Sequence, residues 1–391
     1  MRQLPFEYAF RNLSRSGVRL GASFLGSTLV VLLVLTSGGF VRGMQRTLTQ
    51  PSPLNDNVIL LGAGSEESIE RSQIDAGVPT LAAASIEGIR RAAGTEFVSP
   101  EIHIALPVRA SSSSPEPREA VMRGIHPVAL LVHPEVEIVE GRLPRQGENE
   151  LMVGGLAHAR LGLPPERLRP GERIWFDNRD WTIVGRFVAP TTVMDAEIWL
   201  PLPDLQIATK RESSLSCVIL TLDDPRTFAE ADLFAKSRLD LELTAIRETD
   251  YYRSIALFYR PIRAMILVTA ALIAVGGLLG GLNTMYAAFA SRVREVGTLQ
   301  SLGFTRASIV LSLVEESTFT AACGALVATV FGLALLDGLA VRFSMGAFAL
   351  MLDAPVVLSG LLAALVVGIA GAVPPAIRCL RLPITEALRA H

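Results

Sequence analysis

The chain has 391 residues, of which 50% are apolar and only 19% are charged, and its mean hydropathy is +0.40. Ordinary soluble domains carry about 25% charged residues, so this composition excludes a typical soluble enzyme. The formal net charge of −2 also excludes the strongly basic surface of a nucleic-acid-binding protein.

Four stretches of 20 to 27 residues contain no charged side chain. About 20 helical residues cross the apolar core of a bilayer, and buried core helices are usually shorter and keep a polar stripe. The first stretch is also longer than the apolar region of about 7 to 15 residues in a signal peptide, so we expect a retained anchor. The sequence therefore predicts four transmembrane helices, built on residues 20–41, 264–290, 317–336 and 354–377.

Arginines concentrate before the first stretch, between the second and third, and after the fourth. Loops rich in arginine and lysine stay on the cytoplasmic side, which places both termini in the cytoplasm and residues 42–260 outside it. The expected segments are an amphipathic helix (1–18), transmembrane helices (19–41, 261–290, 307–336 and 354–377), an extracytoplasmic domain (42–260), a cytoplasmic segment (291–306), an external loop (337–353) and a cytoplasmic tail (378–391).

The expected external domain reads as mixed α and β. Residues 43–263 hold 24 basic and 31 acidic side chains, a net charge of −7, and one cysteine, Cys217, so no disulfide can form within them. Apolar patterns predict strands at 57–61, 97–98, 102–108, 120–122, 150–153, 198–200, 217–222 and 241–246 and a hairpin over 171–187 that turns at 177–180. Helical spacing predicts helices near 156–161 and 227–238. The fold class is therefore a four-helix membrane protein with an α+β domain, in which two mixed halves flank a β-rich insertion at about 125–190.

No motif for catalysis or metal binding is present. The phosphate loop of ATPases needs a lysine after glycine, and neither Lys210 nor Lys236 follows one. The five histidines have no companion ligands at metal spacing, so we expect them in surface loops. These are His103, His126, His133, His158 and His391. We therefore expect no catalytic residue, no metal site and no cofactor on this chain.

Small residues recur at four-residue spacing in the expected membrane helices. Such spacing lets helix backbones approach closely in lipid, and packing within one chain explains it as well as packing between chains. The candidate packing residues are Gly276, Gly277, Gly280, Gly281, Gly360, Ala364 and Gly368.

The segment "SRVREVGTLQSLGFTRASI" lies between the second and third spans. Val293, Val296, Leu299 and Leu302 fall at helical spacing, and Gly303 can end the helix. A short apolar stripe of this kind can dock into a groove on a cytoplasmic partner, although the pattern alone also fits a simple basic loop.

This segment and three others resemble a known family, the permease subunits of ATP-binding-cassette (ABC) systems of the MacB, LolC and FtsX type. "REVGTLQSLGFTRASIVLSLVEES" resembles the coupling segment and third span of that family, and "PPAIRCLRLPITEALRAH" resembles its ending. "AFRNLSRSGVR" resembles its start, and "GENELMVGGLAHARLGL" with "GERIWFDNRDWTIVGRF" resembles the external core of the MacB type.

The resemblance implies an export or mechanotransmission subunit in the cell (inner) membrane that is not itself an enzyme. It implies two copies of a separate ABC ATPase, which bind ATP and magnesium, and a second permease chain, a homodimer in preference to a heterodimer. It also allows a periplasmic membrane-fusion adaptor. The alternative is a signalling or hydrolase-activating scaffold that moves no solute. The residues implied to contact or orient the ATPase are Arg294, Glu295, Val296, Gly297, Leu299, Leu302 and Gly303.

Overall fold

The computed structural model describes residues 17–49, 56–114, 116–290, 293–343 and 346–380. The chain divides into two compact units, each described here by itself. The helical unit comprises residues 1–42, 261–339 and 350–391, and the α+β unit comprises residues 43–260 and 340–349. Most of the amphipathic helix expected at 1–18 and of the tail expected at 378–391 lies outside the described residues.

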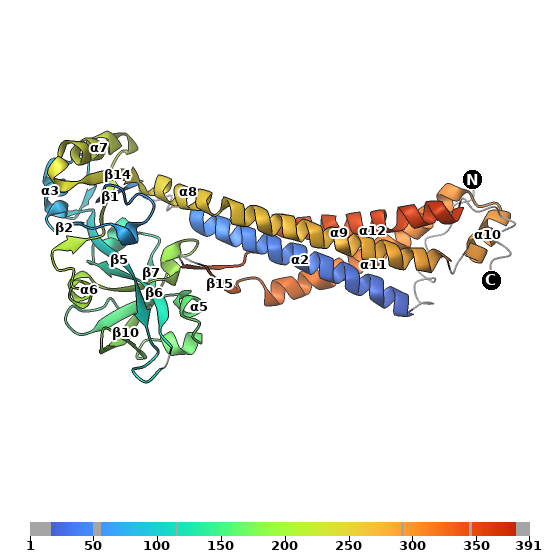
Figure 1. Ribbon diagram of the computed structural model, residues 1–391, viewed down its shortest axis with the longest axis horizontal. Helices are drawn as coiled ribbons and strands as arrows, with labels where there is room; N and C mark the ends of the chain where they lie inside the picture. Colours follow the sequence, from blue (N-terminus) through green and yellow to red (C-terminus); the bar gives the residue numbers. More distant parts are fainter. Residues whose placement is uncertain (1–16, 50–55, 115, 291–292, 344–345, 381–391) are drawn as a thin grey trace. The chain divides into compact units, whose positions relative to one another are not determined.

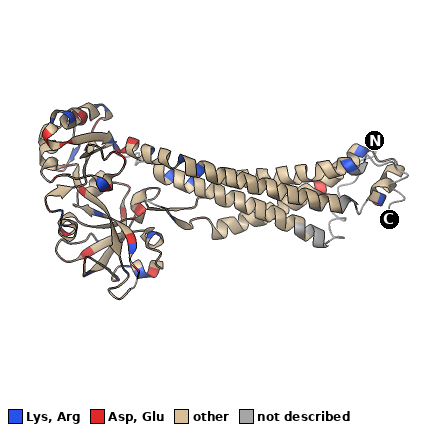
Figure 2. Cartoon of the chain, viewed as in Figure 1, with Lys and Arg blue, Asp and Glu red and all other residues tan. Residues whose placement is uncertain are grey.

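Four long helices are long and apolar enough to cross a membrane (Figure 1). Their candidate spans are Ser23–Leu48, Arg260–Ala287, Arg306–Leu335 and Ala354–Arg378. Charged side chains are sparse along them, as Figure 2 shows. The helices are α2 (Gly17–Thr49), α9 (Arg260–Ala290), α11 (Arg306–Leu335) and α12 (Ala354–Leu380), and a short helix, α10 (Val293–Ser301), lies between α9 and α11 in the sequence.

Pro261 starts a helix and does not kink one. Helix α8 (Glu248–Phe258) ends two residues before α9 begins at Arg260. Proline is tolerated in the first turn because the N–H that it lacks has no partner there.

The α+β unit is built on a ten-stranded sheet with the order β14-β1-β13-β5-β6-β11-β8-β10-β7, and β9 pairs with β10. Most neighbouring pairs are antiparallel, but β6 with β11 and β8 with β10 are parallel. The strands from the expected β-rich insertion lie at one end of this same sheet. The sheet strands are β1 (Asp56–Gly62), β5 (Val98–Val108), β6 (Arg118–Ile125), β7 (Glu137–Gly141), β8 (Glu150–Gly154), β9 (Arg173–Phe176), β10 (Arg179–Val188), β11 (Ile198–Pro201), β13 (Cys217–Leu222) and β14 (Leu243–Arg247).

One face of the sheet carries the main apolar core. Alternation along the strands places Val58 and Leu60 of β1 and Val218 and Leu220 of β13 on this face. Residues of four helices pack in the same cluster, namely α3 (Val78–Ser85), α5 (Ala157–Leu161), α6 (Leu202–Thr209) and α7 (Phe228–Ser237). The opposite face is contacted by α8 and by α4 (Ala129–Val132). The presence of a mixed α+β unit and four apolar helices in one chain confirms the expected fold class.

A hairpin from the expected external loop belongs to the α+β unit. Strands β15 (Ala340–Phe343) and β16 (Gly346–Ala349) pair antiparallel and belong to this unit, although the residues on either side of them belong to the helical unit. Phe348 is fully buried, and Phe343 packs edge-on against Tyr259 with ring centroids 5.6 Å apart. The sequence predicted only a loop here. The minor two-stranded pairs are β2 (Ile74–Asp75) with β12 (Ser214–Leu215) and β3 (Arg91–Ala92) with β4 (Thr95–Glu96).

Candidate functional site

Polar residues occupy adjacent positions on neighbouring strands of the α+β unit, on the face opposite the apolar core. Glu101 and His103 alternate with buried Ile102 in β5, so both point to this face. Arg123 of β6 is the register partner of His103, and Cys217 of β13 is the register partner of Glu101. All four polar side chains are buried. The sheet therefore assembles an ionic cluster from residues that are far apart in the sequence.

Glu101 accepts four hydrogen bonds. Ser99 Oγ donates to its Oε1 over 2.8 Å, and His133 Nε2 lies 3.1 Å from the same oxygen. Arg123 Nη1 donates to Oε2 over 2.8 Å, and His103 Nε2 also lies 2.8 Å from it. Buried charges need such partners, because removal from water costs several kcal/mol for each ion.

Arg123 joins Glu101 to a second buried carboxylate, Glu197. Its Nε and Nη2 donate to Glu197 over 2.7 and 2.9 Å, a bidentate arrangement. The indole N–H of Trp199 donates to Glu197 Oε2 over 2.7 Å, and the Arg123 guanidinium lies 5.3 Å from the centroid of the Trp199 ring. Every nitrogen of this guanidinium therefore has a carboxylate acceptor.

The cluster shifts the pKa values of its two histidines in opposite directions. Burial alone would lower the pKa of His133, but the Glu101 carboxylate outweighs it and raises this pKa to about 10. Burial and the Arg123 charge together lower the pKa of His103. Burial would raise the pKa of Glu101, but Arg123 and His133 hold it well below its usual range. At neutral pH the cluster contains a cationic His133 and a neutral His103.

Three residues of the cluster lie close enough together to hold a metal ion. Ligand atoms of Glu101, His103 and Cys217 lie within 4.8 Å of one another. However, both oxygens of Glu101 already accept hydrogen bonds, and the Arg123 cation contacts the same Oε2 that a metal would need. Burial raises the pKa of the Cys217 thiol well above its usual value, so the thiolate that metals bind is disfavoured. These residues fit a structural ionic cluster better than a metal centre.

The cluster also fixes two helices to the sheet. His133 immediately follows α4, and Glu248 is the first residue of α8. Asn57 Nδ2 of β1 donates to Glu248 Oε2 over 2.7 Å and to the carbonyl oxygen of Val132 over 3.1 Å. Burial raises the pKa of Glu248.

The expectation that the histidines lie in surface loops is wrong for two of them. His103 and His133 are buried, whereas His126 and His158 are partly exposed and His391 lies outside the described residues. Alternating polar residues such as Ser99, Glu101 and His103 usually indicate a solvent-facing strand surface. Nothing local in the sequence indicates that α4 and α8 cover them.

In the helical unit, α10 has one buried face and one exposed face. Val296 packs with Ile309 and Leu313 of α11 and Ala376 of α12, and Leu299 packs at the edge of this cluster. Gly297 is also buried, while Arg294, Glu295, Leu302 and Gly303 are exposed. The exposed positions Thr298 and Ser301 were not among the residues expected from the sequence.

Gly303 ends the α10 segment. Its φ is +88°, a backbone conformation that side chains larger than glycine disfavour. The N–H of Leu302 donates to the carbonyl oxygen of Thr298 over 3.0 Å, and the Gly303 N–H donates to that of Gln300 over 3.1 Å. The predicted role of Gly303 as a helix terminator is consistent with this geometry.

The small residues of the membrane helices fall into two groups. Ala364 is buried, and a Cβ at Gly360 or Gly368 would lie 2.9 Å from Leu35 Cδ2 or 2.8 Å from Thr318 Cα, respectively. A Cβ at Gly277 would contact Val30 of α2. In contrast, among the described residues a Cβ at Gly276, Gly280 or Gly281 would meet no atom within 4 Å apart from its chain neighbours and the backbone of its own helix. The first group packs helices within the chain, and the second leaves room on α9.

Comparisons with known proteins cover both units. Residues 21–232 match the family described as MacB-like periplasmic core domain, and residues 267–384 match the family described as FtsX-like permease C-terminal. None of the curated proteins matches.

Two solved structures resemble part of the chain. The periplasmic region of MacB from Actinobacillus actinomycetemcomitans is 12% identical, with a TM-score of 0.38, over 51% of this chain and 92% of that one. The extracellular domain of the noncanonic ABC-type transporter YknZ from Gram-positive bacteria is also 12% identical, with a TM-score of 0.36, over 49% of this chain and 100% of that one.

The periplasmic core match spans more than half of the chain, and the permease match covers three of the apolar helices. Together with the four apolar helices and the α+β unit, these matches show that the chain belongs to the FtsX/MacB-type ABC permeases, the membrane subunits of ABC-transporter systems.

Proposed function

We propose that this permease couples ATP hydrolysis on a separate ABC ATPase to movement of its extracytoplasmic domain, the α+β unit. The movement would drive export or transmit force to an external partner. ATP and magnesium would bind the ATPase, and this chain would supply the surface on which the ATPase acts. The observation that carries the proposal is the two-faced packing of α10.

Helix α10 suits a role in coupling because its two faces do different things. Val296 packs one face against α11 and α12, and Gly297 is buried next to it, so a force on α10 reaches both membrane helices. The other face presents Arg294 and Glu295, and Leu302, in the turn directly after α10, is 61% exposed. An exposed leucine beside charges fits a docking residue for a groove on a partner.

The coupling role can be tested by changing the exposed face of α10. The full chain would be co-expressed with its cognate ATPase, and co-purification and ATPase stimulation would be measured. We expect Leu302→Asp to lower ATPase stimulation by about tenfold or more, because it places a charge in an apolar contact. The change should leave the melting midpoint of the permease unaltered.

Leu239→Asp is the matched control, because Leu239 is 82% exposed and lies in the α+β unit. It should leave stimulation unchanged. Full stimulation by the Leu302 variant, together with an intact ATPase complex, would refute the assignment of α10.

We further propose a second copy of this chain as a partner. Among the described residues, none of the most apolar window of α9 is buried, and no side chain occupies the space beside Gly276 and Gly281. Small residues on a membrane helix allow another helix to approach closely. We place this homodimer in the inner membrane, surrounded by lipid. The arginine distribution supports an orientation with both termini in the cytoplasm. A membrane-fusion adaptor remains part of this proposal as a further partner.

A further inference from the structure

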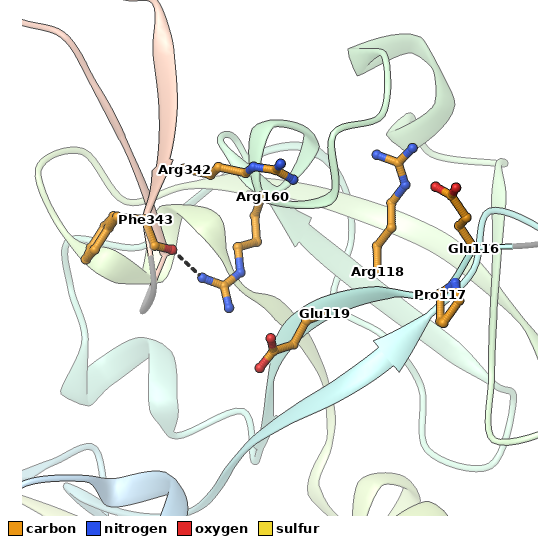
Figure 3. Close-up of a pocket in the computed structure, with 7 residues that line it drawn as sticks. All are labelled: Glu116, Pro117, Arg118, Glu119, Arg160, Arg342 and Phe343. Carbon is orange, nitrogen blue, oxygen red and sulfur yellow. Dashed lines mark hydrogen bonds between the residues drawn. The ribbon is translucent and has the colours of Figure 1, made fainter.

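A polar pocket of about 600 Å³ lies in the α+β unit and is lined by none of the residues of the ionic cluster. It is lined by the segment leading into β6, by Arg160 of α5 and by the hairpin strand β15. Its volume is in the range of pockets that bind small molecules, about 300 to 1,000 Å³. Figure 3 shows its lining residues, which are Glu116, Pro117, Arg118, Glu119, Arg160, Arg342 and Phe343.

Arg118 is held in place by backbone oxygens. Its Nη1 donates to the carbonyl oxygens of Leu161 and Gly162 over 2.6 and 2.7 Å, at the end of α5. Both acceptors are uncharged, and within the described part of the chain Arg118 forms no ion pair with a carboxylate. The guanidinium is thus fixed in position with its charge available to a ligand.

Arg342 brings a second positive charge close to the first. It is exposed on β15, and its Nη1 lies 4.0 Å from the position that a Cβ on Gly162 would take, a position that Arg118 Nη1 also contacts. In the residues that the structure covers, Arg342 has no carboxylate partner either. Two guanidinium groups that converge on one glycine repel each other unless an anion lies between them.

A different arginine fixes the hairpin that carries Arg342. Arg160 is 9% exposed, and its Nη1 donates to the carbonyl oxygen of Phe343 over 2.7 Å, as the dashed line in Figure 3 shows. This bond attaches β15 to α5 one residue after Arg342. The two positive charges therefore come from parts of the fold that are already held together.

The pocket also contains two carboxylates, Glu116 and Glu119. Glu116 and Glu119 are exposed at the pocket, and neither has an ion-pair partner within 4 Å among the described residues. A simple dianion would be repelled by these carboxylates. A ligand that carries both an oxyanion and an ammonium group would match both sets of charges.

We propose that this pocket binds a zwitterionic phosphate ligand, with the phosphate between Arg118 and Arg342 and the ammonium group facing Glu116 or Glu119. The ligand would connect β6 and α5 to the hairpin. Arg342 lies seven residues after the end of the apolar helix α11, so a phospholipid headgroup is one source of this chemistry, and a soluble solute is the other.

The first experiment measures binding of soluble headgroups to the full chain in a neutral maltoside detergent by calorimetry. Glycerophosphoethanolamine, the zwitterion, should bind, and glycerophosphoglycerol, which lacks the ammonium group, should bind more weakly. Arg342→Gln should weaken binding of the zwitterion by about tenfold, because one charge-assisted hydrogen-bonding group is lost. Glu116→Gln combined with Glu119→Gln should remove the preference for the zwitterion.

Arg173→Gln is the matched control, since Arg173 is exposed on β9 of the same unit but does not line the pocket. It should bind the zwitterion as the unaltered chain does. Arg342→Gln removes no hydrogen bond to another described residue, so its melting midpoint should stay unchanged.

The second experiment identifies the source of the ligand. The full chain would be placed in phosphatidylglycerol nanodiscs with and without phosphatidylethanolamine, and amide hydrogen exchange in β15 and β16 would be measured. Slower exchange with phosphatidylethanolamine, lost in Arg342→Gln, would identify a lipid headgroup. Binding in the first experiment without this protection would identify a soluble ligand. Absence of both effects, or equal binding by the Arg342 variant, would overturn the proposal.

Discussion

Arg123 Nη1 donates a hydrogen bond to Glu101 Oε2 over 2.8 Å, and both side chains are buried. The pair lies between β5 and β6 at the centre of the ionic cluster, and the remaining nitrogens of Arg123 hold Glu197. Arg123 thus bonds two buried carboxylates, which makes the stability of the α+β unit depend on this side chain.

We predict that Arg123→Met destabilises the α+β unit by about 3 to 5 kcal/mol, because Glu197 is left buried without its cation and Glu101 keeps only His133. For a domain of this size the melting midpoint should fall by about 10 °C. All three tryptophans of the chain lie in this unit, so intrinsic fluorescence of the full chain reports its unfolding selectively. Arg179→Met, at an exposed position, is the control, and equal midpoints for the two variants would contradict the prediction.

The pH dependence of stability should carry the signature of His133. The ordinary pKa of histidine is 6.5. In the folded chain burial lowers the pKa of His133, but the Glu101 carboxylate outweighs burial and raises this pKa to about 10. A raised histidine pKa stabilises the fold fully below pH 6.5, and this contribution is lost as the pH rises toward 10. Between these values the melting midpoint of the unaltered chain should fall more steeply than that of His133→Gln. His158→Gln, outside the cluster, should follow the unaltered chain, and parallel curves for all three proteins would count against this assignment.

Two glycines of the membrane helices should respond differently to the same change. Gly368→Val should destabilise the helical unit by about 1 to 3 kcal/mol, since the first added carbon already lies 2.8 Å from Thr318 Cα. Gly276→Val meets open space and should leave the thermal stability of the monomer unchanged.

If α9 forms the proposed contact between copies, the Gly276 variant should instead shift the protein from dimer to monomer. Size-exclusion chromatography after a heating series reports the first property, and mass photometry reports the second. A monomer–dimer balance that is the same for Gly276→Val and the unaltered chain would exclude this face of α9 from the dimer contact.

We predict that the Cys217 thiol does not react with maleimide in the folded protein. The thiol is fully buried, so a reagent does not reach it. Burial also raises the pKa of the thiol well above its usual value, so the reactive thiolate does not form. In a full chain with Cys323→Ser and Cys379→Ser, maleimide should label Cys217 only after denaturation. Leu239→Cys in the same background tests the reagent, because this position is exposed and should label at once. Rapid labelling of native Cys217 would show that the cluster opens to solvent.

Local patterns in the sequence determined much of the architecture. Four uncharged stretches predicted the long apolar helices, because span length and composition are properties of consecutive residues. Alternation predicted strands such as β1, β6 and β13, and helical spacing together with Gly303 predicted α10. The resemblance to the permease family also rested on contiguous segments, which the matches at 21–232 and 267–384 support.

Only the tertiary structure decided which polar residues are buried together. Glu101, Arg123 and Cys217 become neighbours through pairing of β5 with β6 and β13, and α4 and α8 then exclude water from them. The sequence likewise shows an apolar stripe on α10 but not that Val296 faces α11 while Leu302 faces outward. The hairpin that carries Arg342 reads locally as a loop. In each case the deciding contacts join residues that are distant in the chain, so burial and ionisation depend on long-range pairing that short patterns do not contain.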